Sequence, residues 1–209
     1  MACCRESSCA MFLSAALLLS NVAVAQDYRP VTSLLEIRKQ NVVVQEWDLS
    51  CGAAALATIL NYQHGDPVSE RDIATRLMSR AEYLENPMLV RFRQGFSLLD
   101  LKRFVDARGY KGVGLGQLTF EHLVARGPMI IPINTFGYQH FVVFRGTLGN
   151  RVLLADPAFG NRTLLRSAFE DAWIDFPEVG HVGFVVKRKD GLIPPNQLAP
   201  TANDFVTLF

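Results

Sequence analysis

The stretch Gln45–Leu60, QEWDLSCGAAALATIL, combines a single cysteine with a run of small apolar residues. Gly65 and Pro67 follow the run, which is typical of a helix that ends there. Because alanine side chains let neighbouring elements approach closely, the run predicts a central helix that is covered on all sides. Cys51 stands at the start of this helix, and it is the only cysteine beyond residue 9.

Residues 1–25, MACCRESSCAMFLSAALLLSNVAVA, have the features of a secretory signal peptide. A positive charge lies near the start, an apolar stretch follows, and Ala23-Val24-Ala25 forms a small-x-small cleavage site. We therefore expect cleavage before Gln26 and a periplasmic protein. An uncleaved anchor is the alternative, but the apolar stretch is shorter than the roughly 20 residues that span a bilayer, so we expect no stable membrane span after cleavage.

Cleavage there would remove Cys3, Cys4 and Cys9 and would leave Cys51 alone. A single cysteine cannot form an internal disulfide bond. In an exported protein it is either a small buried hydrophobe or a thiol retained for its reactivity, and both interpretations stay open at this point.

The composition excludes several classes of partner. Lys and Arg number 21 and Asp and Glu number 20, so the net charge is +1, and no basic cluster occurs. We therefore expect no nucleic-acid partner. No group of cysteines and histidines has the spacing of metal ligands, and we expect neither a metal nor a cofactor. A hydrophobic content of 49% predicts one well-filled globular domain.

Along the chain, a helical half precedes a half made of strands, which predicts an α+β fold with a central cysteine-bearing helix on a C-terminal antiparallel sheet. We divide the chain into a signal peptide (1–25), a lead-in segment (26–43), a catalytic domain (44–188) and a loosely attached C-terminal extension (189–209). After the central helix we expect helices at 69–78, 97–109 and 119–127, and strands at 128–134, 140–146, 151–157, 162–166 and 181–188.

Catalysis by a cysteine requires a base, a group that orients the base, and donors for an oxyanion. His140 begins one predicted strand and Asp156 ends the next, so a hairpin between these strands brings the two side chains to the same edge of the sheet. The Gln45 amide, six residues before Cys51, can supply an oxyanion donor together with the Cys51 N–H. A helix start favours an anion, so we expect a Cys51 thiolate paired with a His140 imidazolium.

Four motifs in this order resemble the C39 family of papain-like cysteine peptidases, the bacterial double-glycine leader peptidases and their free-standing relatives. They are Gln45 with Ser50-Cys51-Gly52, then Gly95–Leu101 (GFSLLDL), His140–Val143 (HFVV), and Ala155-Asp156-Pro157. The resemblance implies a papain-like fold. It makes Cys51 the nucleophile, His140 the general base and acid, Asp156 the orienting carboxylate and Gln45 the oxyanion donor. We also expect Gly52, Gly95 and Phe96 to contact the substrate.

The chain is more similar to stand-alone, exported members of this family than to those attached to a transporter, and one such member accompanies the Fap functional-amyloid system. The resemblance thus implies a protein or peptide substrate from a secretion or functional-amyloid export system. Two alternatives stay open: a binding or assembly accessory that keeps the peptidase fold and holds a partner chain with little or no turnover, and acyl transfer to an acceptor other than water, which uses the same residues. Residues 79–96 are either a surface connector or a flap over the cleft.

Overall fold

The computed structural model describes residues 33–205, so the predicted signal segment 1–25 lies outside the described residues. The structure contains the central helix and the three further helices that the sequence predicts. Within 33–205 the α-helices are α1 (Leu34–Lys39), α2 (Cys51–Thr58), α3 (Glu70–Met78), α4 (Ala81–Glu85), α5 (Leu89–Phe92), α6 (Leu98–Ala107), α7 (Phe120–Arg126) and α8 (Arg166–Ala172), with a π-helical turn η1 (Ile59–Gln63) and a 3-10 turn η2 (Ala202–Phe205).

The strands form one antiparallel sheet of six strands in the order β1-β8-β2-β3-β4-β5, and β6 and β7 form a separate small hairpin. Helices first and an antiparallel sheet second confirm the predicted α+β class. The strands are β1 (Tyr110–Leu115), β2 (Met129–Thr135), β3 (Tyr138–Leu148), β4 (Arg151–Asp156), β5 (Gly160–Leu165), β6 (Asp175–Phe176), β7 (Gly180–His181) and β8 (Gly183–Arg188).

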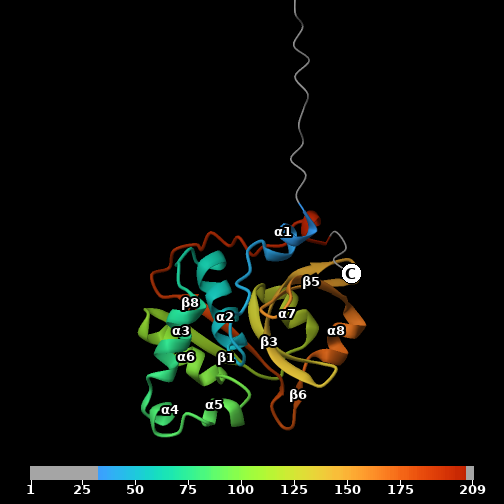
Figure 1. Cartoon of the computed structure of the whole chain (residues 1–209). Coiled ribbons are helices and arrows are strands. Elements are labelled where there is room, and N and C mark those ends of the chain that lie inside the picture. Colours follow the sequence, from blue (N-terminus) through green and yellow to red (C-terminus); the bar gives the residue numbers. More distant parts are fainter. Residues whose placement is uncertain (1–32, 206–209) are drawn as a thin grey trace, which may run out of the picture. The chain divides into compact units, whose positions relative to one another are not determined.

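Helix α2 is central, as the alanine-rich run predicts. All eight of its residues are buried, and it contacts β3 and β4 on one side and α3 and α6 on the other. Figure 1 shows α2 beside β3, between the helices and the sheet. Its one internal polar side chain is satisfied, because Thr58 Oγ1 donates to Ala54 O and accepts from Val43 N. A helix with apolar residues all round is stable only in such a position.

The β3–β4 hairpin sets the positions of the predicted catalytic residues. Pairing runs from Leu148 opposite Arg151 to Val143 opposite Ala155, with a bulge between Phe144 and Gly146. His140 and Asp156 lie just beyond the last pair, so both reach the same end of the sheet. The hairpin expected from the sequence is therefore confirmed.

Strand β1 was not predicted, because glycines at positions 112 and 114 weaken a strand pattern. Gly112 is needed for packing here. A Cβ atom at this position would lie 2.8 Å from Phe184 Cζ on β8 and 2.8 Å from Val105 Cγ2 on α6. The missing side chain thus lets α6 lie directly against the sheet.

The C-terminal extension packs on the domain, so the loose attachment expected from its sequence is wrong up to Phe205. Leu198 is fully buried, and its carbonyl accepts a hydrogen bond of 3.1 Å from Arg145 Nε. Arg145 also pairs with Asp204 at 3.3 Å. Between residues 33 and 205, no helix has the length and apolar character needed to cross a membrane.

Candidate active site

Cys51 occupies the first position of α2 and is buried, with 4% of its surface exposed. The backbone N–H groups of Phe141, Gly52 and Cys51 itself face its sulfur. The Phe141 N–H is available because the pairing of β3 with β4 stops at Val143. Since Phe141 follows His140 directly, this contact brings the thiol and the imidazole into one site.

His140 and Asp156 form a buried pair. His140 Nε2 lies 3.2 Å from Asp156 Oδ1 and 3.1 Å from Oδ2, and neither side chain is exposed to solvent. A carboxylate accepts, so Nε2 carries the proton in this tautomer and Nδ1 is left with a lone pair. Nδ1 is buried and has no hydrogen-bond partner among residues 33–205. It is therefore free to accept a proton.

Gln45 links the segment before α2 to the end of β4. Its backbone N–H donates to Pro157 O at 2.8 Å, and its Nε2 donates to Trp47 O at 3.1 Å. The Trp47 carbonyl accepts one amide hydrogen and so identifies the NH₂ end of the side chain, which leaves a second hydrogen for another acceptor. All four residues expected to carry the chemistry thus lie where the ends of α2, β3 and β4 meet.

The ionisation of Cys51 differs from the expectation. Burial raises the pKa of the Cys51 thiol; the facing N–H groups oppose this effect, while the charge of Asp156 adds to it. The helix start contributes only part of an elementary charge, which does not compensate for the loss of hydration. Because His140 Nδ1 has no partner, no hydrogen bond ties the thiol to the ring at rest. The direction of this shift disfavours the expected thiolate–imidazolium pair, which stays a prediction.

The rate of alkylation of Cys51 as a function of pH tests whether the pKa of its thiol is raised. A raised pKa leaves less thiolate at any pH below it than the usual value near 8.5 would. The rate of reaction with iodoacetamide, followed by mass spectrometry of the Cys51 peptide, should be low at pH 7. It should then rise about tenfold per pH unit until well above pH 8.5. The unfolded chain serves as the control with an ordinary thiol. Fast alkylation below pH 7 would instead establish a resting thiolate.

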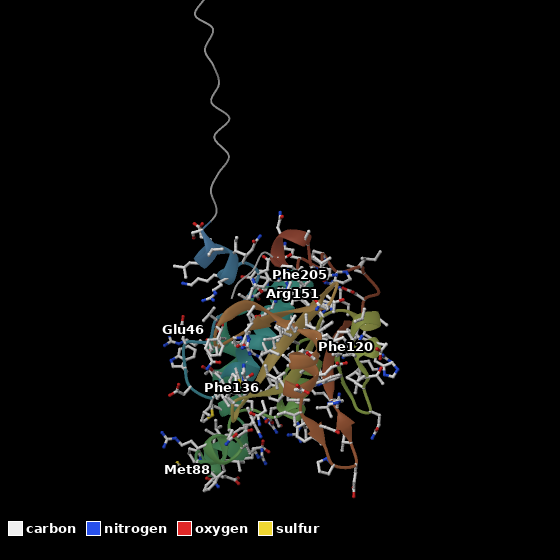
Figure 2. All side chains as sticks on the ribbon, turned by 90° about the vertical axis from the view of Figure 1, so that its right-hand side faces the viewer. Glu46, Met88, Phe120, Phe136, Arg151 and Phe205 are labelled. Atoms are coloured by element: carbon white, nitrogen blue, oxygen red, sulfur yellow. The ribbon has the colours of Figure 1, made fainter. Side chains whose placement is uncertain are left out.

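A cavity of about 520 Å³ opens at Cys51. Three segments supply its walls: the turn before α2, the region of α5, and the β2–β3 turn. Figure 2 shows Glu46, Met88 and Phe136, which come from these three regions, on the same side of the molecule. The lining residues are Asp48, Leu49, Cys51, Arg91, Gln94, Gly137, Tyr138 and Gln139.

Residues 79–96 contain α4 and α5; the sequence allowed two interpretations of this segment, a surface connector or a flap over the cleft. The two helices differ in how far they are buried against the rest of the domain. Tyr83 of α4 is fully buried and donates from its hydroxyl to Asp100 Oδ2 at 2.6 Å. Burial, followed by this bond to an anion, raises the pKa of Tyr83 to about 12, so the hydroxyl keeps its proton. Helix α5 has no buried residue, yet it brings Arg91 into the cleft. Leu89 and Val90 of α5 pack against the core, so α5 forms part of the cleft wall, and its movement as a flap stays a prediction.

The three expected substrate contacts lie off the cleft wall. Gly52 is buried in α2, and Phe96 is 5% exposed with its ring edge-to-face against Tyr83. Gly95 has φ +124°, and a Cβ atom there would lie 2.9 Å from Leu49 O. Leu49 itself has φ +66°, a left-handed conformation that is strained for leucine. Contact of these three residues with substrate stays a prediction. Gly95 packs against Leu49, in the turn that precedes Cys51.

Replacement of Gly95 by alanine should destabilise the fold by about 1–3 kcal/mol, because the new methyl group meets the Leu49 carbonyl and the backbone conformation is unfavourable. Thermal unfolding measures this as a fall in Tm of roughly 2–12 °C. Gly114→Ala is the matched control, because nothing lies within 4 Å of its Cβ position. Equal Tm values for the two variants would contradict the packing role.

Two residues of the site carry no signal that we recognised in the sequence. The Tyr138 ring stacks on the His140 ring with a centroid distance of 4.5 Å and an interplanar angle of 25°. Burial, and then the charges of Cys51 and Asp156, raise the pKa of Tyr138. Arg162 Nη2 lies 2.8 Å from Asp156 Oδ2. Its position two residues into the strand that pairs with the Asp156 strand could have indicated this contact.

The chain belongs to the peptidase C39 family, a family of cysteine peptidases, since the model of that family matches residues 39–176. It is 37% identical over 146 residues to a protein of Pseudomonas aeruginosa named "Probable functional amyloid protease FapD", and 38% identical over 151 residues to a protein of the same name from Pseudomonas fluorescens. Each match covers 70% of this chain and 62% of the relative, so the chain spans less than two thirds of these relatives.

Solved structures show the same fold. A double glycine motif protease from an AMS/PCAT transporter, solved with a leader peptide, superposes with a TM-score of 0.53 at 24% identity, covering 70% of this chain and 90% of that one. A putative C39-like peptidase from Bacillus anthracis gives 0.52 at 19% identity, covering 71% and 95%. These matches confirm the predicted papain-like α+β architecture.

Proposed function

We propose that this chain is an exported thiol peptidase that hydrolyses a peptide bond in a protein or peptide partner of a functional-amyloid secretion system. The observation that supports the chemistry is the buried His140–Asp156 pair. Within residues 33–205, this pair leaves His140 Nδ1 without a hydrogen-bond partner. The next residue, Phe141, directs its backbone N–H to the Cys51 sulfur. The two Pseudomonas relatives named as functional amyloid proteases support the choice of partner.

In the first half of the reaction, the substrate carbonyl enters the cleft beside Cys51. The thiol passes its proton to His140 Nδ1 as the sulfur bonds to the carbonyl carbon, and the carbonyl oxygen becomes an oxyanion. The Cys51 backbone N–H and the free hydrogen of Gln45 Nε2 donate to that oxygen. His140 then protonates the leaving amine as the C–N bond breaks, and an acyl-enzyme remains.

In the second half, His140 acts as a base again. It takes a proton from water while the water oxygen attacks the thioester carbon, and it returns the proton to Cys51 as the C–S bond breaks. Asp156 stays ionised throughout, because its function is to hold Nε2–H and to stabilise the imidazolium that forms twice.

Trapping tests this function. A peptide vinyl sulfone based on a candidate amyloid subunit should form a stable thioether with Cys51 and add its mass to the peptide that contains this residue. Cys51→Ala should remain unlabelled. Lack of labelling by any thiol-directed peptide in the folded protein, with labelling after unfolding, would overturn the peptidase proposal.

Export is part of the proposal and rests on the small-x-small site at residues 23–25. The mass of the protein recovered from the periplasmic fraction should correspond to a chain that begins at Gln26. Recovery of the whole chain with residues 1–25 still attached would contradict cleavage.

The binding or assembly accessory is a second candidate, and one observation favours it. Cys51 is only 4% exposed, and burial raises the pKa of its thiol, both of which disfavour an exposed thiolate. An accessory would bind the partner chain in the cleft with equal affinity in the native and Cys51→Ala forms, and it would release no product. Product release over many turnovers by the native form alone would exclude it.

A further inference from the structure

Asp156 is fully buried, and donor groups of three residues in the described part of the chain approach its carboxylate. His140 Nε2 approaches both oxygens, the Ala158 N–H donates to Oδ1 at 2.9 Å, and Arg162 Nη2 lies 2.8 Å from Oδ2. The Arg162 contact is the shortest of these. It is also the one in which the donor is charged at every physiological pH.

Arg162 is held in place for this contact. It lies on β5 opposite Leu154, two residues beyond Gly160, the partner of Asp156 in the β4–β5 pairing. Its side chain is 18% exposed, and its guanidinium lies over the Phe159 ring at 5.3 Å. A buried ion pair of this kind contributes little to stability, because desolvation offsets the attraction. Stability alone therefore does not explain the Arg162–Asp156 contact, and a role in the chemistry of the active site does.

We propose that Arg162 is a positioning residue of the reaction: it fixes the Asp156 carboxylate and supplies its counter-charge while His140 is neutral. The inference rests on the proposed peptidase function. A carboxylate in a dry site with no other cation would be compensated only by an imidazolium, and the ring would then hold the proton that it has to pass on. With Arg162 present, the carboxylate keeps its charge and its orientation in both states of the ring.

Other ionisable or charged groups line the cleft beside the pair. Asp48 lies in the turn before α2 and Cys51 is the first residue of that helix, Arg91 comes from α5, and Tyr138 on β3 stacks on His140. These groups line the cleft, whereas Arg162 contacts Asp156 and does not line it. Loss of Arg162 should therefore act on the proton transfers and leave substrate binding unchanged.

The test compares Arg162→Met with Arg162→Lys. In Arg162→Met we expect kcat to fall about tenfold or more, with KM unchanged. The acid limb of the pH profile should move upward by about one pH unit, because the ring keeps its proton to a higher pH beside an uncompensated carboxylate. Arg162→Lys restores a cation and should recover most of the rate. A uniform loss of rate at every pH, with no rescue by lysine, would overturn the proposal.

Arg166→Met is the matched control. Arg166 also pairs with carboxylates, Glu121 at 2.9 Å and Glu170 at 3.1 Å, and its guanidinium also lies over an aromatic ring, that of Phe120 at 4.1 Å. It lies on α8, outside the site, so its loss should leave kcat and the pH profile unchanged. A shift of the profile in this variant equal to that in Arg162→Met would mean that the effect is one of overall charge, and it would overturn the proposal.

Two further measurements separate this inference from the peptidase function. In the Asp156→Asn background, Arg162→Met should cost little additional rate, since Arg162 acts through Asp156; full additivity would contradict that route. In Cys51→Ala, which has no turnover, the downfield proton signal of His140 Nε2–H should be sharp while Arg162 is present. The same signal should be broadened or lost once the Arg162→Met substitution is added. An unchanged signal overturns the positioning role, whereas absence of turnover in the native chain overturns only the peptidase proposal.

Discussion

Replacement of Cys51 by serine should abolish peptide cleavage while the fold survives. The oxygen is smaller than sulfur and fits the buried position at the start of α2, so packing is retained. A hydroxyl is a far weaker nucleophile than a thiol beside the same base. Loss of a nucleophile in hydrolases of this type lowers kcat on the order of 10⁴–10⁶-fold. The measurement is kcat/KM on a peptide that the native protein cleaves, together with Tm.

A second variant, Cys51→Ala, controls for the residual hydroxyl, and both variants should unfold within a few degrees of the native protein. If either variant retained a tenth of the native activity, Cys51 would not be the nucleophile. If both lost activity together with a large fall in Tm, Cys51 would instead be a structural hydrophobe, which is the interpretation that the sequence alone left open.

Replacement of His140 by alanine should lower kcat by a similar amount, on the order of 10⁴-fold or more. Burial raises the pKa of the Cys51 thiol, which increases the dependence of its attack on a base that accepts the proton. Asp156→Asn should cost less, about 10²–10⁴-fold, since the ring remains present while its tautomer is no longer fixed. Steady-state kinetics on the same peptide measures both.

His181→Ala is the matched control, because His181 also stacks on an aromatic ring, that of Trp173, with a centroid distance of 4.3 Å. It lies on β7, away from the cleft, and its loss should leave kcat unchanged. Equal losses in the two histidine variants would indicate that stacking and stability, rather than proton transfer, explain the effect of His140.

The sequence predicted those parts of the fold that local patterns specify. The alanine-rich run predicted a helix that is covered on all sides, because its small apolar residues leave no polar face for solvent. Helix α2, with all eight residues buried, confirms this prediction. The β3–β4 hairpin followed from two apolar strands joined at Gly149-Asn150, and it was sufficient to bring His140 and Asp156 together. Residues that consecutive elements place beside one another could therefore be predicted from local sequence patterns.

The sequence did not predict features that depend on packing between segments far apart in the chain. Gly112 lies in β1 because α6 needs the space, which no local pattern records. Arg162 depends on the register of β5 against β4, and a shift of one residue would point it to the other face. The direction of the shift in the Cys51 pKa depends on how completely the surrounding elements exclude water. A helix-start argument considers the local field alone, and here burial is the larger effect.

Arg145, in the bulge of β3, has a consequence for where the polypeptide can be cut. Only 2% of this residue is exposed, and burial lowers the pKa of its guanidinium. Its partners are Leu198 O and Asp204 in the C-terminal segment, together with Asn161, whose amide in turn donates to Ile37 O and Gln40 O before the catalytic region. A fragment trimmed to residues 44–188 would keep Cys51, His140 and Asp156, but it would lose the Arg145 contacts with Leu198 O and Asp204 and should unfold at a lower temperature. Within residues 33–205, the segments before residue 44 and after residue 188 are thus connected through Arg145 and Asn161 to the strand that bears His140, and a truncation should keep both segments.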